Sequence, residues 1–75
     1  MSFTLYLRDD CHDCERVLEW LNATSIAIDI DDIDAPHDPL APHLFAAPAL
    51  CDGPRLLAYG MDIIRWFETH RKKVT

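Results

Sequence analysis

Two cysteines separated by two residues are the part of this sequence best suited to chemistry. The segment Cys11-His12-Asp13-Cys14 follows an alternating apolar–polar stretch and opens a helical pattern. At a helix N-terminus, unpaired backbone N–H groups and the helix dipole favour an anion and would stabilise a thiolate on Cys11. Cys14 comes one turn later, on the apolar helix face, where it can resolve a mixed disulfide formed at Cys11. The spacing therefore predicts dithiol–disulfide exchange, with two packing cysteines as the structural alternative.

The charges near this pair are mostly negative. Four acids lie within a few positions of Cys11, namely Asp9, Asp10, Asp13 and Glu15. Each disfavours a second anion nearby, whereas a protonated His12 would act in the opposite sense. We expect the effect of the acids on the Cys11 thiolate to exceed that of His12, so that the pair is more reducing than a strongly oxidising CxxC pair.

The elements that must position the cysteines follow from the hydrophobic pattern. Alternation from Ser2 to Leu7 predicts a first strand, and Asp10 is the expected N-cap of the helix after it. The apolar face of that helix holds Cys14, Val17, Leu18 and Leu21. Residues 22–25 end the helix, and alternation over residues 26–31 predicts a second strand with one acidic, solvated face.

The second half of the chain predicts a short connection, a hairpin and a final helix. Three prolines between residues 34 and 45 forbid a long helix there but allow a short one that begins at Asp38. Asp52-Gly53 between apolar runs 48–51 and 55–59 predicts a hairpin, and Asp62 can cap the last helix. The order strand–helix–strand–(short helix)–strand–strand–helix predicts an α/β fold, with helices on the faces of a mixed four-stranded sheet.

Three segments of the sequence resemble the glutaredoxins of the thioredoxin superfamily. Residues 6–14 look like their strand end, basic residue and CxxC, and residues 47–53 resemble their Val-Pro strand followed by Asp-Gly. Residues 59–62 resemble the Gly-Gly-x-Asp that opens their last helix. The resemblance covers nearly the whole chain in the right order, and only the middle helix is shortened.

The resemblance implies a single glutaredoxin-like domain over residues 1–75, with a thioredoxin-like three-layer sandwich. It also implies a cis bond before Pro48, beside the cysteines, and an extended substrate bound by the backbone of Ala47. Arg8 would meet a glutathione carboxylate, and Asp62 would lie near the glutathione amino group. We count His12 and Asp13, between the cysteines, among the residues that contact the substrate.

Some positions depart from the glutaredoxin pattern. His-Asp replaces the usual Pro-Tyr between the cysteines, Ala46 replaces a threonine, and Tyr59 replaces one of the paired glycines. These departures bear on glutathione specificity more than on the fold.

Composition limits the partners. The formal net charge is −6, and the only basic cluster is Arg71-Lys72-Lys73, so nucleic acid is not an expected partner. No apolar run approaches the roughly 20 residues of a membrane span, and no secretory signal is visible, so we expect a cytoplasmic protein. We also expect the protein to be a monomer. We expect no tightly bound cofactor. The expected partners are protein disulfides or glutathione, which is a candidate reductant, and a reductase that serves cell redox homeostasis.

The third cysteine and two histidines in the connection allow other interpretations. Cys51 lies on a predicted core strand, where a packing role is the usual one and a regulatory thiol the alternative. Cys11 and Cys14 with His37 and His43 would make a zinc set, but the spacings are longer than those of common zinc fingers, so we predict no metal site. A non-catalytic module of the same fold, which holds a metal or iron–sulfur cluster or docks a protein, is the alternative to an oxidoreductase.

Overall fold

Four short strands form one mixed sheet in the computed structural model, which describes residues 3–37, 39 and 41–71. The order along the chain is β1 (Phe3–Leu7), α1 (His12–Ala23), β2 (Asp29–Asp32), β3 (Ala49–Asp52), β4 (Arg55–Tyr59) and α2 (Asp62–Arg71). In the sheet the order is β2-β1-β3-β4, with β1 parallel to β2 and antiparallel to β3. This is the mixed four-stranded sheet that the sequence predicts.

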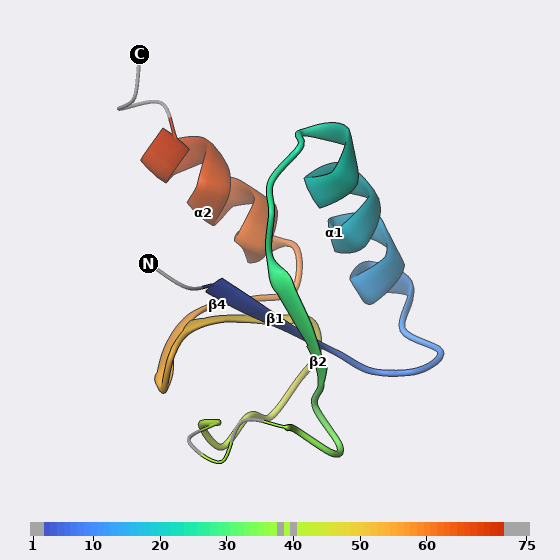
Figure 1. Cartoon of the computed structure of the whole chain (residues 1–75). Helices are drawn as coiled ribbons and strands as arrows, with labels where there is room; N and C mark the ends of the chain where they lie inside the picture. The colour runs from blue at the N-terminus through green and yellow to red at the C-terminus, as the bar shows by residue number, and fades with distance from the viewer. Residues whose placement is uncertain (1–2, 38, 40, 72–75) are drawn as a thin grey trace.

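Both helices cover the same face of the sheet (Figure 1). Leu5 of β1 and Leu50 of β3 are fully buried against α1 and α2. The helices contribute the rest of this buried cluster, which is Val17, Leu21, Ile63 and Phe67. The apolar face predicted for α1 is therefore the face that packs, and burial of this cluster fixes the start of α1 over the carboxyl end of β1.

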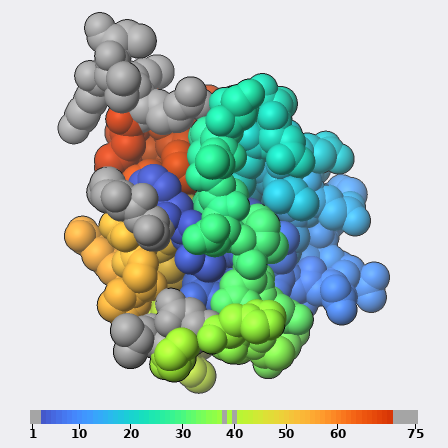
Figure 2. Space-filling view, in the orientation of Figure 1, coloured from blue at the N-terminus to red at the C-terminus, as the bar shows by residue number. Residues whose placement is uncertain are grey.

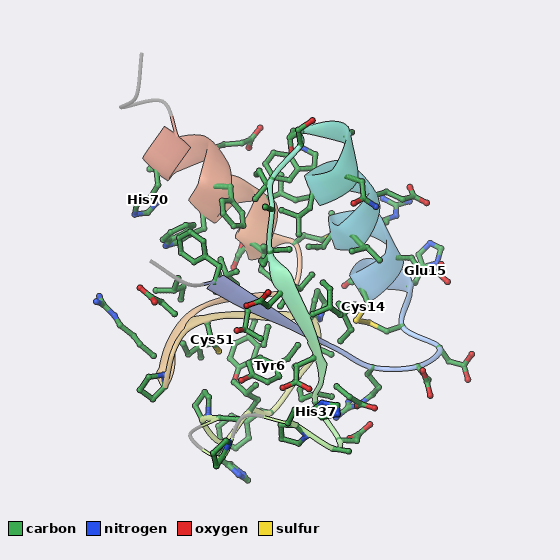
Figure 3. The ribbon with its side chains drawn as sticks, viewed as in Figure 1. Tyr6, Cys14, Glu15, His37, Cys51 and His70 are labelled. Atoms are coloured by element: carbon green, nitrogen blue, oxygen red, sulfur yellow. A yellow bond between two sulfur atoms is a disulfide. The ribbon has the colours of Figure 1, made fainter. Side chains whose placement is uncertain are left out.

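The opposite face of the sheet is covered by irregular chain. Tyr6 and Cys51 lie on this side, away from the helices (Figure 3), and pack with Ala49 against the connection between β2 and β3. That connection supplies Ile33, Ala41 and Leu44. The predicted short helix is wrong for the described residues, because none of residues 33–37, 39 and 41–48 is helical. Its expected cap, Asp38, lies outside the described residues.

In the described residues the layer opposite the two helices is therefore irregular chain and not the expected short helix. The prolines give the physical reason. Pro36, Pro39 and Pro42 each lack a backbone donor, which disfavours a helix here, and the described residues of the segment are irregular.

The second strand is shorter than its alternation predicts. It begins at Asp29, which pairs with Thr4, and the ladder with β1 ends at the pair of Leu7 and Asp32. Ile26 and Ile28 precede the strand and are partly buried against the main core, whereas Ile30 in the strand is 50% exposed.

The hairpin and final helix agree with the sequence pattern. Gly53, in the turn between β3 and β4, has φ +60°, and Gly60, between β4 and α2, has φ +58°. Both values lie in the left-handed region that glycine adopts without steric cost. The N–H of Gly60 donates a hydrogen bond to the carbonyl of Pro48 over 2.8 Å, which ties the start of β3 to the turn before α2. No helix in the described ranges is long and apolar enough to cross a membrane.

Candidate active site

A disulfide joins Cys11 and Cys14 at the start of α1 (yellow bond near the Cys14 label, Figure 3). Their Cα atoms are 5.1 Å apart. Cys11 is itself the N-cap, and its Sγ accepts a hydrogen bond from the backbone N–H of Cys14 at 3.1 Å. The prediction that Asp10 caps this helix is therefore wrong. Asp10 has φ +54°, in the left-handed region, whereas Cys11 has the extended conformation typical of an N-cap.

This cap geometry bears directly on the chemistry of the pair. The amide that contacts Cys11 Sγ belongs to the first turn, whose N–H groups lack partners within the helix. In the reduced protein the same donor would point at a thiolate, which favours its negative charge over the neutral thiol. The helix therefore places a backbone donor where the predicted thiolate stabilisation requires one.

The two sulfurs differ in exposure. Both cysteines line a surface groove, but Cys14 is only 4% exposed, whereas Cys11 is partly exposed. A substrate from solution can therefore reach Cys11 more readily than Cys14. This is the asymmetry expected of an attacking and a resolving cysteine.

The start of β3 passes beside the disulfide. The carbonyl oxygen of Ala47 lies 3.7 Å from Cys11 Sγ, close enough for the reduced thiol to donate a weak hydrogen bond. Pro48 is fully buried, and the Ala47–Pro48 peptide is cis, as the resemblance to glutaredoxins implied.

A groove of about 430 Å³ opens beside the cysteines, between the turn before α1 and the end of β2. Its apolar lining consists of Leu7, Leu18 and Ile30, of which Ile30 is 50% exposed. Its charged lining consists of Arg8, Asp9, Asp10, Glu15, Asp31, Asp32 and His37. In Figure 2 the two walls are the blue turn and the green segment that contains β2.

Two ion pairs hold the segment after β2 to the edge of this groove. Arg8 donates to both carboxylate oxygens of Asp34 at 3.4 Å, and both side chains are exposed. Nδ1 of His37 lies 2.9 Å from a carboxylate oxygen of Asp31, which also accepts the backbone N–H of His37. The hydrogen bond to Asp31 raises the pKa of His37 above its usual range, because the carboxylate favours the protonated ring.

The predicted site residues are only partly brought together. Cys11, Cys14 and Arg8 line the groove, and Ala47 contacts it through its carbonyl. His12 and Asp13 are exposed on the first turn of α1 and do not line the groove.

Asp62 lies elsewhere, at the start of α2. It borders a separate pocket with Arg65, Trp66 and His70, so the groove beside the cysteines does not include it. Ile30, Asp31 and Asp32 also line the groove, although the sequence pattern did not predict them as site residues. Their signal was the parallel pairing of β1 and β2, which brings the carboxyl ends of both strands to one edge of the sheet.

The third cysteine has the packing position that the sequence predicts. Cys51 is fully buried on β3 and carries no disulfide. Burial raises the pKa of its thiol, because the apolar surroundings penalise the thiolate. Within residues 3–37, 39 and 41–71, no group of three or more His, Cys, Asp or Glu side chains is placed to hold a metal ion.

Comparison of the chain with protein-family models, curated proteins and solved structures finds no match. Any statement about its function therefore depends on the geometry of the site.

Proposed function

We propose that this chain is a thiol–disulfide oxidoreductase of thioredoxin-like, glutaredoxin-type fold, which reduces disulfides in proteins or mixed disulfides of glutathione. The observation that carries the proposal is the Cys11–Cys14 disulfide at the N-terminus of α1, with one sulfur accessible and the other buried. A glutaredoxin-type fold is supported by the sheet order, by the CxxC between β1 and α1, and by the contact of Ala47 with Cys11.

The reaction runs in two exchanges from the reduced protein. The Cys11 thiolate attacks one sulfur of the substrate disulfide, so that a mixed disulfide forms and the other substrate sulfur leaves as a thiolate, which takes up a proton. Cys14 then loses its proton and attacks Cys11 Sγ, which closes the Cys11–Cys14 disulfide and releases the second substrate thiol. The substrate gains two electrons and the protein dithiol loses two.

A thiol reductant returns the protein to its dithiol form by the reverse exchange. Glutathione or a dedicated reductase is the proposed source of these electrons, and no tightly bound cofactor is needed for any step. Since Cys11 is the accessible sulfur of the pair, the reductant would attack there first.

The role of each sulfur is tested by trapping the intermediate. Cys14→Ser should accumulate a stable mixed disulfide with a peptide disulfide substrate, and Cys11→Ser should form none. Cys51→Ser is the matched control, because this buried thiol lies outside the proposed chemistry, and it should react like the unmodified protein. Mass spectrometry of the adduct identifies the cysteine that carries it. Adducts on Cys14, or equal exchange by Cys11→Ser, would refute the assignment.

The same preparation addresses the non-catalytic alternative. A metal- or cluster-binding module should carry metal after purification and show no exchange in this assay. An oxidoreductase should exchange disulfides whether or not a chelator is present.

A further inference from the structure

The groove beside the cysteines has an uneven charge. Five carboxylates line it, from Asp9, Asp10, Glu15, Asp31 and Asp32. Arg8 is the one guanidinium in this lining, and its donors already face Asp34. His37 adds a cation only when protonated, and its ring is then paired with Asp31. A ligand in this groove therefore meets a negative field.

The groove also has an apolar floor. Ile30 is half exposed at the sheet edge, and Leu7 and Leu18 lie in the same lining as both cysteines. An exposed isoleucine next to a reactive sulfur can bury an apolar side chain of a bound segment. Glutathione carries net negative charge and offers no large apolar side chain, so it matches neither property.

We propose that the groove selects peptide or protein disulfides with a lysine or arginine beside the cysteine and an apolar side chain next to it, in preference to glutathione. The inference rests on the proposed function, because it names the substrate class of that same site. The substrate cysteine would reach Cys11 beside the Ala47 carbonyl. Its cationic neighbour would face Asp9 and Glu15, and its apolar neighbour would cover Ile30. Charge complementarity of this kind acts mainly on the rate of encounter.

The test uses three short peptides, each with one intramolecular disulfide and a leucine beside it. They differ only in carrying lysine, glutamine or glutamate next to the cysteines. The fully reduced protein is mixed with each peptide in a single turnover, and formation of the Cys11–Cys14 disulfide is followed. Rates are divided by those of the same peptides with dithiothreitol, which removes intrinsic differences in disulfide reactivity.

We expect the lysine peptide to react about tenfold faster than the glutamate peptide at low salt, and the ratio to approach one at about 1 M salt, where screening is strong. Glu15→Gln should lower the ratio about two- to threefold. Glu68→Gln is the matched control, because it removes the same charge from an exposed position on α2 outside the groove, and it should leave the ratio unchanged.

The apolar part has its own test. Ile30→Ala should slow the leucine-bearing lysine peptide about threefold and leave a peptide with alanine in place of leucine unaffected. An equal loss with both peptides would overturn this part.

Failure of this inference is separable from failure of the proposed function. Equal rates with all three peptides, or a ratio that Glu15→Gln does not change, would overturn the charge selection while leaving the oxidoreductase intact. If neither the peptides nor oxidised glutathione oxidise the reduced pair, both proposals fall.

Discussion

The ion pair between Arg8 and Asp34 gives a quantitative prediction about anionic substrates. Arg8 is the residue that the resemblance to glutaredoxins assigns to a glutathione carboxylate, yet its donors contact Asp34. Asp34→Asn removes this competitor without removing the arginine. Oxidised glutathione should therefore be reduced faster by the variant, because Arg8 becomes free to meet its carboxylate.

The size of the gain follows from the geometry of the pair. Both contacts are long hydrogen bonds of 3.4 Å, and the side chains of Arg8 and Asp34 are 45% and 64% exposed. Exposed ion pairs of this kind contribute at most about 1 kcal/mol. Release of the arginine should therefore raise the rate with glutathione by at most about fivefold, since 1.4 kcal/mol is tenfold. The melting temperature should fall by no more than about 4–8 °C.

The assay is the single-turnover oxidation of the reduced protein by oxidised glutathione. Asp29→Asn is the matched control, because it removes the same charge from an exposed position on β2 that does not line the groove. The double variant Arg8→Gln/Asp34→Asn should lose the gain. If Asp34→Asn gains no more than Asp29→Asn, or if the double variant keeps the gain, Arg8 does not bind the substrate carboxylate.

Three further predictions concern the titrating groups. Asp13→Asn should move the ultraviolet thiolate titration of Cys11 to lower pH, because it removes a negative charge close to the thiolate, and an unmoved titration would refute the local-charge argument. Cys51, which is buried and has a raised pKa, should resist iodoacetamide in the folded, reduced protein and react only after unfolding, whereas modification as fast as that of Cys11 would contradict its burial. Because Asp31 raises the pKa of His37, the stabilisation from that pair should be complete below the usual pKa of 6.5 and lost as the pH rises through the raised value. Urea unfolding of His37→Gln should therefore differ most from the original protein at about pH 6, where the ring is protonated and a carboxylate is still ionised, and a difference that grows as the pH rises above this would refute the assignment.

Periodicity in the sequence predicted the elements that pack on the main core. Leu5 alternates along β1, and Val17 and Leu21 recur at helical spacing, so their burial between sheet and helices followed from period alone. The hairpin around Gly53 followed from turn chemistry. These features are local in the sequence, and so they could be predicted without knowledge of the tertiary contacts.

Features that depend on tertiary contacts were missed. The register of β2 is set by pairing Asp29 with Thr4, which no local pattern in residues 26–31 encodes. The irregular connection covers Tyr6 and Cys51 through Ile33, Ala41 and Leu44, and proline-rich chain has no period from which such packing could be predicted. The groove lining from β2 also depends on tertiary contacts, and it was therefore missed although Cys11 and Cys14 were identified from their spacing.

The most direct test of the account is the reduction potential of the Cys11–Cys14 pair, measured by equilibration with glutathione and with dithiol buffers. A working redox pair should be a reversible two-electron couple between about −120 and −270 mV, the range of known thiol–disulfide oxidoreductases. A potential below about −300 mV, typical of a structural disulfide, would contradict the proposed function, as would a pair that never oxidises.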